Sequence, residues 1–517
     1  MPSNTLINAL LNPAAYSHPV STISVLETHI SWVLLTGEYA YKIKKPVNFG
    51  FLDFSTLAQR RFFCTEEVRL NQRLAASLYL EVVPITGTPA HPAINGAGEV
   101  IEYAVKMRQF PAHCTLSERA EHQLLSADEI TQIADLIAHF HQQIGQTDAA
   151  SHYGDSADIQ HWFAENFTAM NPLLPHAAQQ QLHRLQVWGE STGQALAAVM
   201  QTRKNQGFVR ECHGDLHLSN MTLIDAKVTL FDCIEFNPKL RWVDVLSEVA
   251  FLFVDLVHSG YEGFAYRLLN RYMQHTGDYG GLVLLPYYLV YRALVCAKIA
   301  LLRHAQQDAL LGRDTSCPTY QSFVDLAERF SLAKPRVLLI THGYSGSGKS
   351  TVAQFVAENT GAVLLRSDVE RKRLLGIASN ASSGSGLAQD AYSEIATKNL
   401  YGYLATHTQT LLAAGFSVVV DAAFLKSEQR DQFKHIADHC GVTMLIIAVH
   451  AALPTLQQRL RQRLNDASEA TLEVLQHQLQ TAQGLSFEEQ QMAIKVDTET
   501  ENYLETTLVT IADSTRH

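Results

Sequence analysis

Gly343-Tyr344-Ser345-Gly346-Ser347-Gly348-Lys349-Ser350 is the stretch that decides the fold of the second half of this chain. It fits the pattern G-x-x-x-x-G-K-[ST], in which backbone N–H groups and the start of a helix bind phosphate. An apolar, β-branched run, Val337 to Thr341, precedes the loop, and Thr351 to Glu358 follows it as a good helix opening. Because the motif requires a strand, a loop and a helix in that order, this context predicts a P-loop.

The loop predicts a nucleotide site with ATP and Mg²⁺ as cofactors. Its glycines let the backbone curl so that successive N–H groups point at phosphate, and the helix start adds partial positive charge. Lys349 is expected to reach the β- and γ-phosphates, and Ser350 is expected to hold magnesium. The expected nucleotide contacts are Gly343, Ser345, Gly346, Ser347, Gly348, Lys349, Ser350 and Thr351. The alternative is a glycine-rich turn that precedes a helix and binds nothing.

The composition is that of a globular chain large enough for several domains. With 517 residues, two to four domains are expected, and 47% hydrophobic and 18% charged residues argue against disorder. The net charge of −11 argues against broad, non-specific binding of nucleic acid. It leaves a local basic site open.

Cysteine usage and the N-terminus predict a cytoplasmic protein. The seven cysteines are scattered, odd in number and without a C-x-x-C pair, which is typical of a reduced, intracellular chain. Met1 to Val20 shows no basic start followed by an apolar core, so no secretory signal is expected. The apolar stretch from Gly280 to Leu302 contains Pro286, Arg292 and Lys298, and its uninterrupted part is too short to span a bilayer. We therefore expect a buried core helix and no membrane partner.

A second motif has His, Asp and Asn at the spacing of the kinase catalytic loop H-R-D-L-x-x-x-N: His213-Gly214-Asp215-Leu216-His217-Leu218-Ser219-Asn220. A hydroxyl that attacks a γ-phosphoryl group needs a carboxylate to accept its proton, and Asp215 suits this task. Asn220, and Asp232 at the end of the next apolar strand, offer oxygen ligands for the metal ions that bridge the phosphates. Gly214 replaces the arginine of protein kinases, and neither D-F-G nor A-P-E is present.

These residues resemble the aminoglycoside phosphotransferase and choline-kinase-like group, and the resemblance covers residues 20 to 330. It implies that Asp215 is the catalytic base, that Asn220 and Asp232 are metal ligands, and that His217 is structural. The alternative is a degenerate kinase fold that binds nucleotide without catalysis.

The resemblance also implies a small lobe with a phosphate-binding lysine on a strand and a glutamate partner on a helix. Tyr39-Ala40-Tyr41-Lys42 imitates V-A-I-K, and Glu67 in the next helical stretch is the expected partner. Lys44 lies on the same side of the strand as Lys42, so alternation does not separate the two lysines. We favour Lys42, and no glycine-rich loop over the phosphates is evident.

After the short linker Ser331 to Arg336, apolar strands alternate with amphipathic helices, which predicts a parallel α/β sheet. The expected strands are 337–341, 362–366, 416–420 and 443–449. Ligands of such sheets bind at the carboxyl ends of the strands, where Asp368 and Asp421 are placed. Asp368 is the candidate to accept a proton from a substrate hydroxyl, and Asp421 is the candidate to assist magnesium or to position substrate. Ser379 to Gly386 is rich in Ser and Gly and is expected to be mobile.

Two arginines, Arg459 and Arg463, lie four residues apart on one face of an expected helix. They could close over the triphosphate and neutralise transition-state charge, and the alternative is an ordinary solvated face. With the P-loop, they resemble a group of P-loop small kinases related to polynucleotide kinase and zeta-toxin-like enzymes, over residues 335 to 500. In that group Asp-x-x-Arg supplies the base and a substrate contact, which implies these roles for Asp368 and Arg371.

The two resemblances imply two domains and one kind of chemistry. The expected fold class is α/β and α+β, with a protein-kinase-like bilobal domain over 1–333 (small lobe 20–110, large lobe 111–330) and a P-loop NTPase domain with a parallel α/β sheet over 334–517. The expected function is ATP-dependent transfer of a γ-phosphoryl group to hydroxyl groups of small molecules. The alternatives are a regulatory ATP-binding protein or ATPase with a ligand-binding kinase-like domain, and a nucleic-acid 5′-hydroxyl kinase in the C-terminal half.

Overall fold

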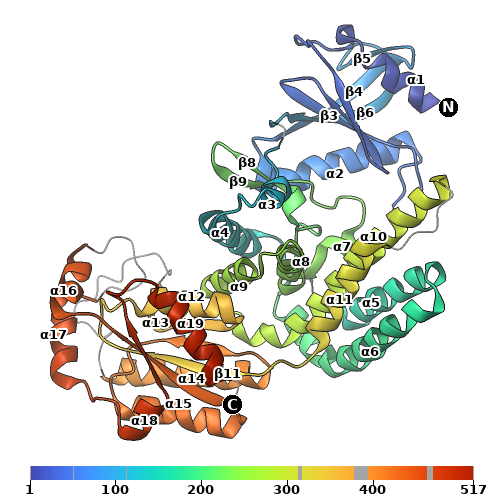
Figure 1. Cartoon of the computed structure of the whole chain (residues 1–517). Coiled ribbons are helices and arrows are strands. Elements are labelled where there is room, and N and C mark those ends of the chain that lie inside the picture. Colours follow the sequence, from blue (N-terminus) through green and yellow to red (C-terminus); the bar gives the residue numbers. More distant parts are fainter. Residues whose placement is uncertain are drawn as a thin grey trace. The chain divides into compact units, whose positions relative to one another are not determined.

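The structure, a computed structural model, describes residues 2–50, 52–111, 113–148, 150–311, 317–377, 394–462 and 470–515 (Figure 1). The chain forms two compact units. The first comprises Met1–Gln132, Phe140–His161 and Ala197–Asp255, and the second comprises Ile133–His139, Trp162–Leu196 and Leu256–His517. These units do not divide at the boundary expected between 333 and 334, which stays a prediction about the two domains.

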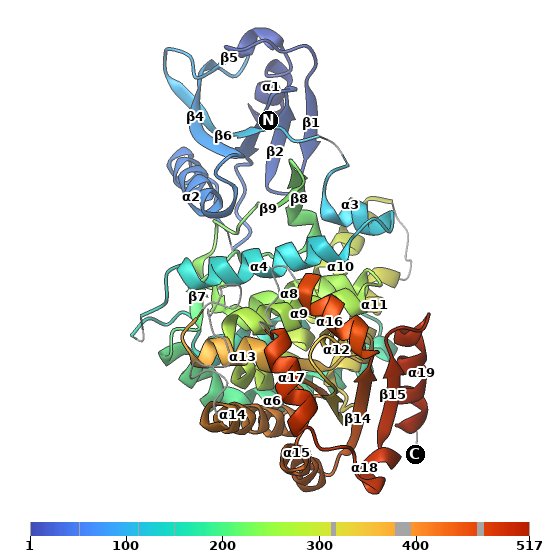
Figure 2. The same ribbon diagram turned by 90° about the vertical axis from the view of Figure 1, so that its left-hand side faces the viewer.

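A six-stranded antiparallel sheet begins the first unit, in the order β1-β2-β3-β6-β4-β5 (Figure 2). The strands are β1 (Ser24–Glu27), β2 (Ser31–Leu35), β3 (Tyr39–Lys44), β4 (Tyr79–Thr88), β5 (His91–Ile94) and β6 (Val100–Arg108). Tyr41 and Ile43 of β3 are buried in the core on one face of the sheet. Because side chains alternate along a strand, Lys42 and Lys44 point to the other face, toward helix α2 (Leu57–Ala75).

Short elements surround the second motif. Strand β7 (Val209–Glu211) pairs antiparallel with β10 (Trp242–Asp244), and β8 (Met221–Ile224) forms a hairpin with β9 (Lys227–Leu230). The motif lies in the loop after β7 and in the 3-10 turn η3 (Leu218–Asn220). The motif therefore lies between β7 and β8, and the apolar strand expected before Asp232 is β9.

Helices account for most of the region from the N-terminus to residue 331. They are α1 (Pro2–Ala9), α2, α3 (Leu116–Glu121), α4 (Ala127–Gln143), α5 (Ser156–Met170), α6 (His176–Asn205), α7 (Pro238–Arg241), α8 (Val245–His258), α9 (Glu262–Thr276), α10 (Leu285–Leu311) and α11 (Pro318–Ser331), with the 3-10 turns η1 (Pro13–Ala15), η2 (Asn171–Leu173) and η4 (Tyr279–Leu284).

Among the described residues, one helix, Tyr279–Gln306, is long and apolar enough to cross a membrane by length and composition. Core helices also meet this criterion. In its most apolar window, with a mean hydropathy of 1.6, 61% of the residues are buried inside the protein. This burial fits the core helix that the sequence predicts for Gly280 to Leu302.

The second unit contains a five-stranded parallel sheet in the order β12-β13-β11-β14-β15. Its strands are β11 (Val337–His342), β12 (Val363–Arg366), β13 (Val418–Asp421), β14 (Thr443–His450) and β15 (Ala493–Asp497). Its helices are α12 (Lys349–Thr360), α13 (Ser367–Leu374), α14 (Glu394–Ala413), α15 (Ser427–Cys440), α16 (Leu453–Gln462), α17 (Leu472–Thr481), α18 (Phe487–Gln491) and α19 (Tyr503–Ser514). The four predicted strands are present within two residues of their expected bounds, and β15 was not predicted.

The core of this sheet is aliphatic. Val352 and Val356 of α12 and Ile511 of α19 pack with Leu339 and Ile447 of the central strands. The helix α12 is thereby fixed behind the P-loop, so that its first turn meets the carboxyl end of β11. The predicted fold class, with a parallel α/β sheet in the C-terminal half, is confirmed.

Candidate functional site

In the first unit, one glutamate contacts both candidate lysines. The Nζ of Lys42 lies 2.8 Å from Glu67 Oε1 and 2.5 Å from Asp232 Oδ1. The Nζ of Lys44 lies 2.6 Å from Glu67 Oε2 and also pairs with Glu235. Burial alone would lower the pKa of Lys42, but the carboxylates of Asp232 and Glu67 raise it well above its ordinary value. Both lysines are therefore held as cations.

Exposure separates the two lysines, which alternation in the sequence does not. The side chain of Lys44 is 1% exposed, whereas that of Lys42 is 12% exposed and its partner Asp232 is 42% exposed. Lys42 thus lies at the open end of this ion-pair chain, as the favoured interpretation requires. Sequence reasoning missed Glu235, whose buried pair with Lys44 has no counterpart in the kinase pattern.

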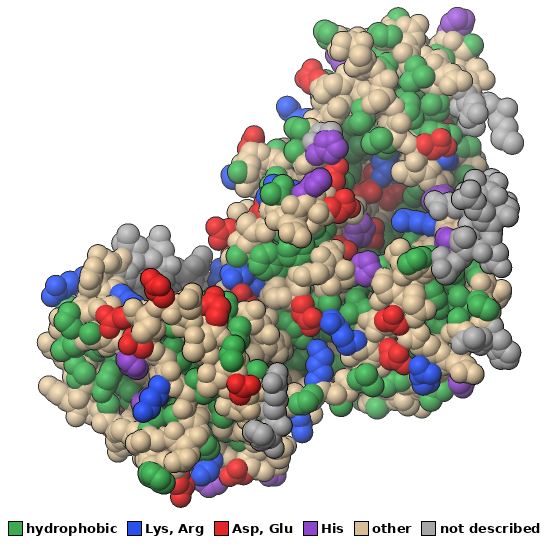
Figure 3. Space-filling model, viewed as in Figure 1, with side chains coloured by type: hydrophobic (Ala, Val, Ile, Leu, Met, Phe, Trp, Pro, Cys, Tyr) green, Lys and Arg blue, Asp and Glu red, His purple; other side chains and the backbone are tan. Residues whose placement is uncertain are grey.

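The residues of the second motif lie together. The Nδ2 of Asn220 donates to both the backbone oxygen and Oδ2 of Asp215, at 3.0 Å each, and His217 Nε2 lies 3.1 Å from the same Oδ2. Burial acts to raise the pKa of Asp215, but His217 and the hydrogen bonds outweigh it and lower that pKa. Asp215 is therefore ionised at neutral pH and able to accept a proton. Figure 3 shows acidic, basic and histidine side chains gathered in a hollow of the upper part of the surface.

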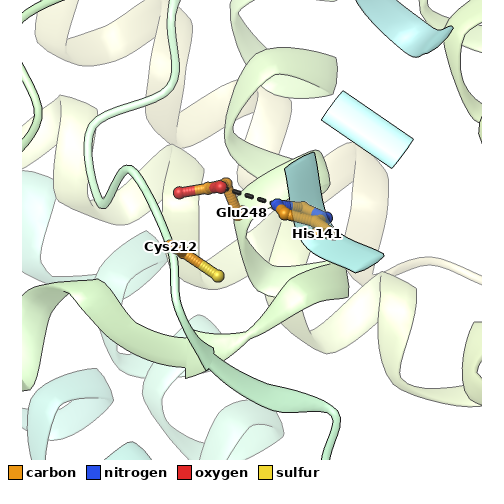
Figure 4. A group of neighbouring side chains, drawn as sticks. All are labelled: His141, Cys212 and Glu248. Atoms are coloured by element: carbon orange, nitrogen blue, oxygen red, sulfur yellow. Dashed lines mark hydrogen bonds and ion pairs between the residues drawn. The ribbon is translucent and has the colours of Figure 1, made fainter. Parts of the chain in front are cut away.

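Two carboxylates fix the backbone of this loop. Glu248 of α8 accepts a hydrogen bond from the Gly214 N–H at 2.6 Å, and Asp255 of the same helix accepts one from the Leu218 N–H at 2.7 Å. His141 Nε2 lies 2.7 Å from the second oxygen of Glu248 (Figure 4). The loop that carries Asp215 is thus attached to a buried helix at two points.

His141, Cys212 and Glu248 could in principle hold a metal ion, since their ligand atoms lie within 4.8 Å of one another. Both carboxylate oxygens of Glu248 already accept hydrogen bonds, however, and the Cys212 thiol lies 3.6 Å from the backbone oxygen of Val243. The hydrogen bonds of Glu248 therefore support the loop that carries Asp215.

In the second unit, the P-loop has the backbone that the motif requires. Gly343, Gly346 and Gly348 have φ angles of 150°, 85° and 93°. A Cβ atom at Gly343 would lie 2.2 Å from the backbone oxygen of Val449, so no other residue fits there. Helix α12 begins at Lys349, which places Lys349 and Ser350 in its first turn. The Lys349 ammonium donates to the Tyr344 backbone oxygen at 2.7 Å.

Residues far along the chain bind the P-loop backbone. The Ser345 N–H donates to Gln478 Oε1 of α17 at 2.9 Å, and Arg459 of α16 donates to the Gly346 oxygen at 3.3 Å. Thr498, which follows β15, accepts from Arg459 at 2.8 Å. Arg459, expected to close over a triphosphate, thus contacts the loop itself, and sequence reasoning missed Gln478 and Thr498. Arg463, and the expected mobile loop from Ser379 to Gly386, lie outside the described residues.

Asp368, Arg371 and Asp421 lie on elements at the carboxyl ends of β12 and β13. Asp421 is the last residue of β13 and lies beside Arg366 of β12, whose Nε is 3.4 Å from Asp421 Oδ2. Asp368 and Arg371 lie on α13, which begins directly after β12. Burial raises the pKa of Tyr401 to about 12, and Arg371, Asp368 and Asp421 all act electrostatically on its hydroxyl. Sequence reasoning also missed Tyr401, whose hydroxyl accepts a hydrogen bond from the Phe424 N–H at 3.1 Å.

The comparison with known families concerns the second half of the chain. Residues 338–485 match the family model described as an AAA domain. The match begins within β11 and includes the whole P-loop, so it confirms the resemblance to P-loop proteins for this region.

Relatives extend over nearly the whole chain. The chain is 27% identical over 462 residues to the uncharacterized protein Rv2004c of Mycobacterium tuberculosis, which covers 89% of this chain and 90% of that protein. An uncharacterized protein of Mycobacterium bovis matches with the same identity and coverage.

Two solved structures match parts of the chain. A choline/ethanolamine kinase family protein from Mesorhizobium loti is 12% identical, with 64% of this chain and 95% of that chain covered and a TM-score of 0.39. A gluconokinase from Sinorhizobium meliloti is 19% identical, with 35% of this chain and 94% of that chain covered and a TM-score of 0.26.

Proposed function

We propose that this protein is an ATP-dependent phosphotransferase with two nucleotide sites, each of which transfers the γ-phosphoryl group to a hydroxyl of a small molecule. The observation that carries the proposal is the 2.5 Å contact between Lys42 and Asp232, which are 190 positions apart in sequence. The lysine proposed to bind phosphate therefore contacts the carboxylate proposed to bind the metal ion. Asp215 precedes Asp232 in the same stretch of chain. The proposal includes a cytoplasmic location and no membrane partner.

At the first site, Lys42 would bind the phosphates while Glu67 fixes its position. Asp232 and the side-chain amide oxygen of Asn220 would offer oxygen ligands of the kind that Mg²⁺ prefers. The side-chain nitrogen of Asn220 donates to Asp215, which leaves this oxygen for the metal. Bound there, Mg²⁺ would neutralise charge on the phosphates. The oxygen of the acceptor hydroxyl forms a bond to the γ-phosphorus, and Asp215 accepts the proton of that hydroxyl. The bond between the γ-phosphorus and the oxygen that bridges it to the β-phosphate breaks, which releases ADP.

At the second site, the P-loop N–H groups and Lys349 would bind the triphosphate, and Ser350 and Asp421 offer oxygens to Mg²⁺. Asp368 would accept the proton of the acceptor hydroxyl, and Arg371 would bind the acceptor. The loop is preorganised for this role, because its backbone is already fixed by Gln478 and Arg459.

Labelling with [γ-³²P]ATP tests both sites at once. We would incubate a metabolite extract with the intact chain, with Asp215→Ala and with Lys349→Ala, and separate the labelled products. Each variant should lose its own set of products, and the double variant should lose all of them. If the intact chain labels nothing, the transferase proposal is wrong.

The same protein variants distinguish the alternatives. Release of phosphate without any labelled acceptor would favour a regulatory ATPase. A 5′-hydroxyl oligonucleotide that becomes labelled, and stops being labelled in Lys349→Ala, would favour a nucleic-acid kinase in the C-terminal half.

A further inference from the structure

Helix α13 carries two pairs of charged residues on opposite faces. Asp368 and Arg371 are three positions apart, and so are Glu370 and Arg373. The second pair is offset from the first by two positions, which corresponds to a rotation of about 200° at 3.6 residues per turn. Glu370 is fully buried. The face opposite the candidate base is therefore an inner, packed face.

Glu370 is held by buried partners within the second unit. The Tyr279 hydroxyl donates to Glu370 Oε1 at 3.0 Å, and Arg373 Nε lies 2.8 Å from Glu370 Oε2. Burial and then the charge of Glu370 raise the pKa of the Tyr403 hydroxyl on α14. Tyr279 is 1% exposed, and burial and then Glu370 raise the pKa of its hydroxyl well above the ordinary value, so it stays a donor.

Arg373 extends from the same face to the end of α9. Its Nη2 donates to the Gln274 oxygen at 2.7 Å, and its Nη1 donates to the His275 oxygen at 3.3 Å. The last carbonyls of a helix have no partner within the helix, so the guanidinium caps α9. A Cβ atom at Gly277 would lie 2.8 Å from this guanidinium, so the glycine also makes room for it.

The same helix α9 binds the strand that leads into α13. Asn270 Nδ2 donates to the Ala362 oxygen at 3.0 Å, and the Leu364 N–H donates to Asn270 Oδ1 at 2.9 Å. Strand β12 is at the edge of the sheet, and the amide of Asn270 satisfies part of that edge. Both β12 and α13 are therefore attached to one helix that precedes the P-loop in sequence.

We propose that Tyr279, Glu370 and Arg373, the anchor residues, are positioning residues for phosphoryl transfer at the P-loop site. They fix the inner face of α13 on α9 and so set the place of Asp368 and Arg371 on its outer face. The inference rests on the proposed function of that site. It also means that the segment from 256 to 331 is part of the working P-loop enzyme, although it lies outside the AAA-domain match.

Tyr279→Phe tests the anchor in the full chain by removal of one hydroxyl. The variant is made on an Asp215→Ala background, so that ATP turnover reports the P-loop site, with water as the acceptor. The matched control is Tyr287→Phe, since the ring of this buried tyrosine stacks on Phe163 and its hydroxyl has no hydrogen-bond partner among the described residues. The measurements are hydrogen exchange of residues 367–377, and kcat and KM for ATP.

In Tyr279→Phe, exchange of α13 should rise about tenfold, as expected for loss of a hydrogen bond to a charged group. The kcat should fall roughly three- to tenfold, on that same basis, with KM for ATP unchanged, because the P-loop itself is untouched. The control should match the parent. Arg373→Lys, which keeps the charge but loses the contacts to α9, should give the same split and serves if Tyr279→Phe does not fold.

Exchange and kcat equal to those of the control would overturn the inference, and so would raised exchange with an unchanged kcat. A parent that neither turns over ATP nor labels an acceptor through the P-loop site would refute the proposed function of that site, and exchange alone would then decide whether the anchor fixes α13.

Discussion

Replacement of Lys44 by Met separates the two lysines that share Glu67. The change removes the ammonium and keeps most of the stem, which leaves Glu67 and Glu235 buried without their common cation. Removal of one partner of a buried ion pair costs about 3–5 kcal/mol of unfolding free energy. Lys42→Met should cost less, about 1–3 kcal/mol, because Glu67 keeps Lys44 and Asp232 is partly exposed.

Lys44→Met should therefore have the larger effect on stability, and Lys42→Met should have the larger effect on the rate of transfer. In calorimetry of the intact chain, Lys44→Met should lower the transition of the first unit by about 10 °C, and Lys42→Met by much less. In transfer assays on a Lys349→Ala background, Lys42→Met should lower the rate about 10²- to 10³-fold.

Lys45→Met is the matched control, since Lys45 pairs with Glu27, whose side chain is 64% exposed, and such pairs contribute about 1 kcal/mol or less. A Lys44→Met chain that keeps its calorimetric transition but no longer binds ATP at the first site would refute the reasoning and make Lys44 the phosphate ligand.

Three further results are expected. Glu248→Gln should lower the kcat of the first site about tenfold and leave the KM for ATP nearly unchanged, because the loop that carries Asp215 loses one charged contact. Steady-state kinetics measures both values, and an unchanged kcat contradicts the prediction. The pKa of Asp215 is lowered, so transfer at the first site should persist as pH falls through the ordinary aspartate range. Because His217 helps to lower this pKa, His217→Leu should shift the acid limb of the pH–rate profile to higher pH, and an unchanged acid limb contradicts this. Gln478→Ala should weaken ATP binding at the P-loop several-fold, about the effect of one hydrogen bond. A fluorescent-nucleotide titration measures this, and an unchanged dissociation constant contradicts it.

The P-loop and its sheet could be predicted because their determinants are local. Gly343 and Gly348 need positive φ, and apolar β-branched runs precede the loop and form the inner strands. β15 (Ala493–Asp497) was not predicted, because it is a short edge strand in which only two of five residues are buried. Alternation gave the shared face of Lys42 and Lys44, but only burial in the folded sheet separates them.

Contacts between distant residues could not be predicted from the pattern. Gln478 and Ser345 are 133 positions apart, and a glutamine on a polar helix gives no sign of its partner. Glu370 and Arg373 look like an ordinary solvent-exposed i,i+3 pair, and only the packed helix α9 shows that their face is inside.

The double use of Glu67 has a consequence for how the first site responds to ATP. When Lys42 binds the phosphates of ATP, its ion pair with Glu67 weakens. The ion pair between Glu67 and the buried Lys44 involves no group that ATP would reach. Helix α2 should therefore keep its orientation through the whole reaction cycle. The site should then be constitutively assembled and not be regulated by a movement of this helix.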